Sequence, residues 1–280
     1  MIQSKSYLLI VSFLLIRPFT GIGQSVSTLM GGRAAGLGYT SSTLGDEWAL
    51  LNNVGGLAKV AKLNTSFAYE VRPKLVGSNR MAAVLSMPFK FGTTGFSLFR
   101  FGDDLYSEQI ISAGFGNQLG IASLGLSINY IQYRAEGIGT RSFVGINFGG
   151  ITEITDKISI GAYIINLNQP KISSIDSEHA PTRLVAGISF KPIEDCLIIS
   201  EVEKELNYDA TIKTGLEYLL HKKINIRTGF NLHPNAAFFG LGFHTRKLKI
   251  DYALQYNQTL STAHQASAIY FIEKKKKENE

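Results

Sequence analysis

Apolar and polar residues alternate along the last third of the chain. From Ala210 to Leu220 the even-numbered positions are mostly apolar, and most positions between them carry charged or small residues. The same period of two recurs from Ile224 to Leu232 and from Leu248 to Tyr256. Because the side chains of a β-strand point alternately to its two faces, this pattern predicts strands with one apolar face and one polar face.

The alternation continues over nearly the whole chain after residue 64 and predicts about fourteen strands. They are Thr65–Arg72, Met81–Phe89, Thr93–Phe101, Glu108–Gly116, Ala122–Tyr133, Ser142–Thr152, Lys157–Asn168, Arg183–Lys191, Leu197–Glu205, Ala210–Leu220, Lys223–Leu232, Ala236–Thr245, Leu248–Asn257 and Gln265–Glu273. Soluble antiparallel sheets alternate too, but no segment remains here to form a second layer over the apolar faces. The sequence therefore predicts an all-β protein, a transmembrane antiparallel β-barrel over residues 64–273 whose apolar faces meet outer-membrane lipid.

The predicted connections differ in length on the two sides of the barrel. Those after the even-numbered strands are short, as in Lys90–Gly92 and His221–Lys222, and the others tend to be longer, as in Gly102–Ser107, Arg134–Arg141 and Gln169–Thr182. Short periplasmic turns and longer surface loops are typical of outer-membrane barrels. With an even number of strands, this arrangement places both termini in the periplasm of a Gram-negative bacterium.

The first 24 residues predict a secretory signal peptide. Lys5 supplies the positive charge, Leu8–Ile16 the apolar stretch, and Gly21 and Gly23 the small residues before a cut near Gln24. No later apolar run approaches the length of a membrane-spanning helix, so a helical membrane protein is excluded. The single cysteine, Cys196, cannot form a disulfide within the chain.

Residues 25–63 lack the strand pattern and predict a short helical plug or hatch segment. Glycines crowd the beginning of this segment, and Thr43–Leu51 has the acidic first turn of a short helix that Asn52–Gly56 would end. The segment could fold into the barrel mouth or lie as a helix across the periplasmic rim. The pattern does not distinguish these two positions.

Three short sequences in this segment resemble the opening of the PorV/PorQ family of outer-membrane proteins. They are Gly32–Gly38, Asp46–Ala49 and Asn53–Ala58, and they contain Arg33, Gly36, Asp46, Trp48, Asn53 and Gly56. Val54 and Gly55 stand where that family usually has Pro and Ala. The family is similar to the FadL-type fatty-acid channels, so the resemblance implies fourteen strands and an N-terminal plug.

The resemblance also implies a role that is not enzymatic. Members of the PorV/PorQ family include components of the type IX secretion system, so we expect protein secretion or surface attachment through secretion-channel subunits or secreted cargo. The alternative is a FadL-like transporter of a hydrophobic small-molecule ligand. Transport would need an apolar pocket and an exit, whereas partner binding would need only a rigid plugged scaffold.

Charged residues at predicted inward positions form the best candidate site. They follow strands nine to thirteen and are Glu201, Glu203, Lys213, Glu217, Arg227, Lys249 and Asp251. Opposite charges on adjacent strands can pair, which predicts either a network that closes the lumen and fixes the plug or a polar path or pocket for a ligand. Glycines inside strands, such as Gly116 and Gly240, would ease curvature or let the plug approach.

Other chemistry is not indicated. The five histidines are scattered without metal-ligand spacing, and no catalytic or phosphate-binding motif occurs, so we expect no enzyme, no cofactor and no metal. The net charge is +6, and Lys274–Lys277 lie in a charged C-terminal tail over residues 274–280. A solvated tail near lipid headgroups explains this run better than a nucleic-acid site does.

Overall fold

The computed structural model describes residues 27–172, 178–257 and 261–273. The predicted signal peptide and the charged tail lie outside the described residues. So do the two chain termini, whose predicted position in the periplasm is therefore not tested. None of the helices in the described ranges is long and apolar enough to cross a membrane.

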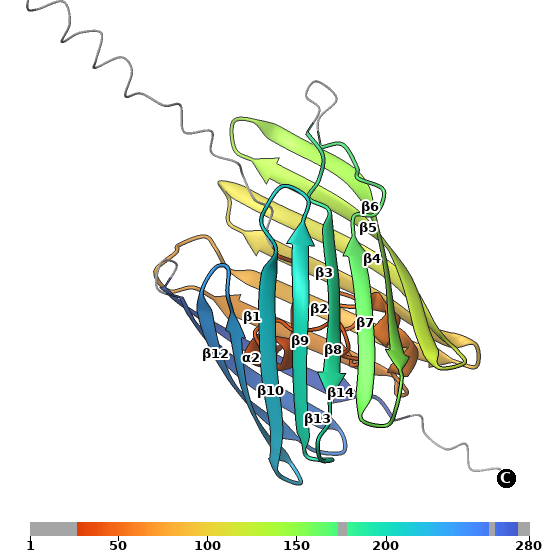
Figure 1. Cartoon of the computed structure of the whole chain (residues 1–280). Coiled ribbons are helices and arrows are strands. Elements are labelled where there is room, and N and C mark those ends of the chain that lie inside the picture. The colour runs from red at the N-terminus through yellow and green to blue at the C-terminus, as the bar shows by residue number, and fades with distance from the viewer. Residues whose placement is uncertain (1–26, 173–177, 258–260, 274–280) are drawn as a thin grey trace, which may run out of the picture.

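Fourteen strands form one closed antiparallel barrel within the described part of the chain (Figure 1). They are β1 (Asn64–Val71), β2 (Arg80–Phe89), β3 (Gly92–Gly102), β4 (Tyr106–Leu119), β5 (Ala122–Ala135), β6 (Gly139–Glu153), β7 (Ile158–Ile165), β8 (Arg183–Phe190), β9 (Cys196–Glu205), β10 (Thr211–His221), β11 (Ile224–Asn231), β12 (Ala236–His244), β13 (Leu248–Asn257) and β14 (Ser261–Phe271). Each strand pairs with its neighbours in sequence, and β1 closes the ring on β14. The predicted fold class is confirmed.

The outer wall of the barrel is apolar. Large side chains such as Leu98, Ile111, Ile128, Phe239 and Leu241 are exposed on it, while the residues between them face the interior. A continuous apolar surface around a closed sheet is stable in hydrocarbon and unfavourable in water.

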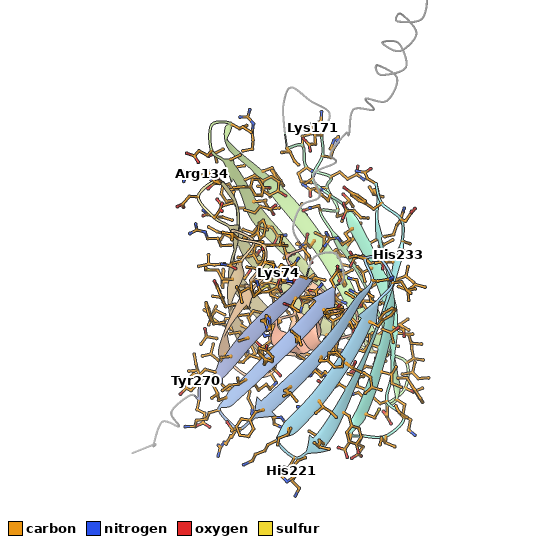
Figure 2. The ribbon with its side chains drawn as sticks, turned by 90° about the vertical axis from the view of Figure 1, so that its left-hand side faces the viewer. Lys74, Arg134, Lys171, His221, His233 and Tyr270 are labelled. Carbon is orange, nitrogen blue, oxygen red and sulfur yellow. The ribbon has the colours of Figure 1, made fainter. Side chains whose placement is uncertain are left out.

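The connections lie at two opposite ends of the barrel, which we name the turn end and the loop end. Figure 2 shows His221, at the turn between β10 and β11, at one end, and Arg134 and Lys171 at the other. The two longest connections, residues 72–79 and 166–182, are at the loop end. The short turns, such as residues 90–91 and 222–223, are at the turn end.

Two predicted loops are wrong for half of their length or more. The predicted loops Gly102–Ser107 and Arg134–Arg141 shrink to residues 103–105 and 136–138, because β4, β5 and β6 continue as a paired ribbon at the loop end. The rings of Tyr133 and Phe143 pack edge to face there with centroids 5.2 Å apart. Such cross-strand contacts extend the ladder beyond the point where the alternation becomes weak.

The plug segment, defined as residues 27–63, lies inside the barrel (Figure 1). Its buried side chains Met30, Trp48, Leu50 and Leu57 belong to one apolar cluster with wall residues such as Phe99. The position across the periplasmic rim is therefore not the one observed. The segment begins near the loop end, since Arg80 at the start of β2 donates a hydrogen bond of 2.8 Å to the Ser27 carbonyl.

The predicted helix over Thr43–Leu51 is wrong. In the part of the chain that the structure describes, the helical elements are α2 (Gly32–Gly36) and the 3₁₀ helix η1 (Val54–Lys59), and the stretch between them forms turns. The Asp46 carboxylate accepts a hydrogen bond from the Trp48 amide, and the Asn52 side chain bonds both backbone groups of Met30. These side-chain bonds compete with a regular helix.

Candidate functional site

A ring of glycines on the inner wall brings the plug into contact with the barrel. Ten of them, within the described residues, are Gly95, Gly114, Gly116, Gly125, Gly149, Gly161, Gly187, Gly215, Gly229 and Gly240. A Cβ atom built on any of these glycines would lie 2.0–3.1 Å from an atom of the plug segment. We call this ring the glycine belt. Six of these glycines face backbone atoms of the plug, and a side chain there would displace the plug, so they serve close approach of two backbones; they are Gly116, Gly125, Gly161, Gly215, Gly229 and Gly240. The other four face side chains of the plug.

The predicted plug residues lie in this contact zone. Gly36 in α2 touches the backbone of Gly240, and Gly56 packs against the carbonyl of Leu44. Trp48 is buried, and the backbone of Gly31 lies against its ring.

Asn53 caps η1 and ties it to the wall. Its side-chain oxygen accepts a hydrogen bond from the Gly55 amide at 3.0 Å. Its side-chain nitrogen donates to the carbonyls of Ser42 and of Gly150 in β6.

Arg33 joins the plug to the wall through a chain of ion pairs. Its guanidinium donates two hydrogen bonds to Glu217 in β10, at 3.0 and 2.6 Å, and lies 3.4 Å from Asp46. Glu217 also accepts a hydrogen bond of 2.5 Å from Arg227 in β11, whose other arm donates to Asp251 in β13 at 2.6 Å. Three of the seven candidate residues therefore form one buried network that Arg33 of the plug completes.

Two further candidate residues bind the plug directly. Glu201 in β9 accepts hydrogen bonds of 2.9 Å from the backbone amides of Ser41 and Ser42. Lys249 in β13 donates to Glu47 at 2.8 Å.

The remaining two candidate residues do not contact the plug. Glu203 in β9 accepts a hydrogen bond of 2.5 Å from Lys213 in β10 and lies 3.3 Å from Arg183 in β8, which also pairs with Glu205. These groups line a cavity at the loop end. The candidate residues therefore divide into five near the plug and two at the mouth.

Sequence reasoning missed a second buried ionic cluster, on the opposite side of the mouth. Glu70 in β1 pairs with Arg80 in β2, and Tyr39 of the plug donates to Glu70 at 2.5 Å. Gln265 in β14 donates to the same carboxylate at 2.9 Å. Glu70 and Gln265 stand at inward positions of their strands, so the alternation used for strands nine to thirteen would have indicated them.

Two cavities lie on opposite sides of the plug. The loop-end cavity has a volume of about 680 Å³, and its lining includes Leu29, Tyr39, Phe101, Phe238 and Asp209. The turn-end cavity has a volume of about 250 Å³, and the plug contributes Arg33, Asp46, Glu47 and Trp48 to its lining. The plug and its ion pairs therefore separate the mouth from the turn end.

Burial raises the pKa of the Asp46 carboxyl above its usual value, and the neighbouring charge of Glu47 acts in the same direction, while Arg33 lowers it. A docked plug therefore holds a proton on Asp46 more tightly than a released plug in water would. It follows that Asp46 supports docking as the pH falls through the raised pKa and opposes it as the pH rises.

We expect the variant Asp46→Asn to remove this pH dependence. Between the ordinary pKa of an aspartate and the raised one, denaturant midpoints of the wild-type protein should decline with pH relative to those of the variant. Midpoints measured across this pH range in both proteins check the expectation. Parallel pH profiles would show that Asp46 does not couple proton binding to docking.

No metal site is indicated, since the described ranges contain no group of three His, Cys, Asp or Glu side chains that could hold an ion.

The fold of this chain is similar to solved structures of outer-membrane transporters and channels, at low sequence identity. The toluene transporter TbuX of Ralstonia pickettii superimposes with a TM-score of 0.66 and 11% identity, over 88% of this chain and 99% of TbuX. A FadL homologue of Pseudomonas aeruginosa gives 0.66 and 10% identity over 89% and 100% of the two chains. The monoaromatic hydrocarbon channel CymD gives 0.68 and 13% identity over 89% and 99%.

The fold is that of a FadL-type outer-membrane barrel. At these identities the likeness shows the fold alone. No protein-family model matches the chain, and no curated protein matches it in sequence. Nothing in these comparisons supports the PorV/PorQ assignment specifically, so the FadL-type architecture is the part of the predicted resemblance that stands.

Proposed function

We propose that the protein is an outer-membrane channel for small hydrophobic molecules, held closed by its plug and without enzymatic activity. The observation that carries the proposal is the plug between two cavities inside a closed barrel with an apolar outer wall. The turns and the end of β14 face the periplasm in this proposal. The similar folds of proteins named as toluene and monoaromatic hydrocarbon channels support it.

The loop-end cavity is suited to bind a small hydrophobic molecule before it passes the plug. Leu29, Tyr39, Phe101 and Phe238 give it apolar surface, and the Tyr39 and Phe238 rings pack edge to face at 5.9 Å. Most charged residues around these side chains are paired with one another, as Lys213 is with Glu203, while the exposed Asp209 forms no ion pair with a described residue. Paired charges present little net field to a ligand, so an uncharged apolar molecule fits better than an ion.

Passage beyond this cavity requires the plug to move. Arg33, Glu217 and Arg227 tie the plug to β10 and β11 on the side of the turn-end cavity, and the glycine belt brings the plug against strands β3–β8 and β10–β12. We infer that the ion pairs hold the resting state and that opening exchanges some of them for water.

Filling the mouth should weaken ligand binding. The variant Asp209→Trp places a large ring at the edge of the loop-end cavity, and we expect about three- to tenfold weaker binding of toluene, a loss of about 1 kcal/mol. The neighbouring variant Asn207→Trp, in the same loop but outside the cavity lining, is the control. Calorimetric titration of the purified barrel measures both variants.

Two other outcomes of this titration would count against the proposal. Wild-type protein that binds no toluene would refute the hydrocarbon ligand. Equal weakening in both variants would show that the cavity is not the binding site, and the variant Asp209→Asn separates loss of charge from added bulk.

Protein secretion or surface attachment remains the competing prediction. A plug fixed by ion pairs would also suit a rigid scaffold for a partner protein. Purification from outer membranes distinguishes the two roles, because a co-purifying secretion-channel subunit or secreted cargo would favour the scaffold and a bound hydrophobic molecule would favour the channel.

A further inference from the structure

Five exposed lysines lie in the turns at the turn end of the barrel, and none of them forms a salt bridge with a described residue, although the charge of Lys191 acts on Glu153. They are Lys90, Lys157, Lys191, Lys222 and Lys223, and we call them the turn lysines. They lie in the connections β2–β3, β6–β7, β8–β9 and β10–β11, so they are spread over a large part of the circumference. A sixth exposed lysine of this end, Lys62 just before β1, lies over the Phe271 ring. Figure 2 shows His221, next to Lys222, projecting from this end.

Large apolar side chains are exposed beside the turn lysines. Phe91 is 75% exposed, Ile121 69%, Ile193 56% and Leu220 62%. The Lys90 ammonium lies 5.7 Å from the centre of the Phe91 ring. These side chains continue the apolar outer wall to the turns. Lysine stems can then lie along hydrocarbon while their ammonium groups reach the headgroup level.

The positive charge of this end is only partly compensated. Its carboxylates Glu153 and Glu273 are already paired, with Lys59 at 2.5 Å and with Arg246 and Lys247 at 3.2 Å. Asp156, Glu194 and Asp195 are the remaining acidic side chains of the described turns, against five turn lysines.

The loop end is balanced by comparison. Its outer basic side chains in the described ranges are Lys74, Arg100, Arg134, Arg141, Lys171 and Lys204. Five acidic ones accompany these six, namely Asp103, Asp104, Glu136, Glu178 and Asp209, so the two charges nearly balance. An excess of positive charge is therefore a property of the turn end and not of the barrel surface in general.

We infer that the turn lysines bind the anionic headgroups of phospholipids in the bilayer leaflet at the turn end. Lysine ammonium groups bind phosphate oxygens through charge-assisted hydrogen bonds, and basic residues near an anionic bilayer surface are attracted to it within a Debye length. The apolar side chains beside them favour a membrane over a soluble acidic protein. The inference requires only that the barrel spans a bilayer, not that it transports a ligand.

Nanodiscs with two lipid compositions test this inference. The purified full chain is placed in discs of phosphatidylcholine alone or with added phosphatidylglycerol, and its thermal unfolding midpoint is measured. We expect phosphatidylglycerol to raise the midpoint by about 2–4 °C at low salt and by less at high salt. Replacing the five turn lysines by glutamine should abolish the rise. Replacing five of the loop-end residues, Lys74, Arg134, Arg141, Lys171 and Lys204, by glutamine should preserve it.

Three results would overturn the inference. The first is a midpoint in the wild-type protein that does not depend on phosphatidylglycerol. The second is an equal loss of the rise in both variants, and the third is an equal rise with inorganic phosphate in phosphatidylcholine discs. If the fivefold turn variant does not fold, Lys222→Gln with Lys223→Gln is compared with Lys74→Gln with Lys171→Gln. Toluene titration of the same samples keeps this test separate from the proposed channel function.

Discussion

Replacing Arg227 by methionine is expected to release the plug and to destabilise the protein by about 3–5 kcal/mol. Arg227 is buried and forms hydrogen bonds to Glu217 and Asp251, at 2.5 and 2.6 Å. In the variant Glu217 would keep Arg33 as a partner, but Asp251 would lose its hydrogen-bond donor among the described residues. A buried carboxylate without a partner costs far more than an exposed one, so the structure should relax by letting water in beside α2.

Two measurements check this result. The denaturant midpoint should fall, and the ionic conductance of the variant in planar bilayers should exceed that of the wild-type barrel. Adding Asp251→Asn to Arg227→Met removes the stranded charge and should recover part of the lost stability. Arg100→Met, on the exposed face of β3, is the control and should change little. If Arg227→Met kept both the midpoint and the conductance, the network would not hold the plug.

The wall of the barrel could be predicted from sequence because each wall position has one of two environments. Outer positions meet lipid and inner positions meet the plug or the lumen, so apolar and polar residues alternate wherever a strand crosses the membrane. The ends of β4, β5 and β6 could not be predicted in this way. Beyond the membrane both faces of a strand meet water, and pairing with a neighbour decides whether the strand continues.

The inward charges could be predicted from the same alternation, but their partners could be predicted only in part. Lys213 lies opposite Glu201 in the β9–β10 register, yet it donates a hydrogen bond to Glu203, and Glu201 instead accepts hydrogen bonds from the backbone of the plug. The bond between Tyr39 and Glu70 likewise depends on how the plug is folded. The fold of the plug is set by contacts between residues far apart in sequence, and the local alternation of residues does not indicate such contacts.

The position of the glycine belt depends both on the alternation of residues along each strand and on the course of the plug backbone inside the barrel. Glycines occur at inward positions on most of the strands, and for Gly116 and Gly240 the sequence indicated only that a glycine inside a strand would ease curvature or let the plug approach. Which glycines touch the plug, and which atoms they meet, follows only from the structure. Alanine substitutions at a belt glycine and at a nearby wall glycine outside the belt should therefore have different effects on stability and conductance.

Replacing Gly125 by alanine should push η1 off the wall and open the lumen. A Cβ atom at Gly125 in β5 would lie 2.3 Å from the Val54 carbonyl oxygen and 2.9 Å from the Gly55 nitrogen. Both are backbone atoms, which cannot turn aside as a side chain can, and Asn53 ties this part of the plug to Gly150. We expect a loss of about 1–3 kcal/mol in unfolding free energy together with higher conductance.

The matched control is Gly150→Ala in the adjacent strand β6, where the added methyl group points to the outer wall and the carbonyl that Asn53 contacts stays in place. A Cβ atom there would meet the tip of the Leu124 side chain at 2.9 Å, and this side chain can move aside. The control should change the unfolding free energy by no more than about 0.5 kcal/mol and leave the conductance at its wild-type level. Equal behaviour of the two alanine variants, in either direction, would contradict a role of the glycine belt in seating the plug. A larger effect of Gly125→Ala alone would show that the closed lumen depends on backbone contact between η1 and the wall.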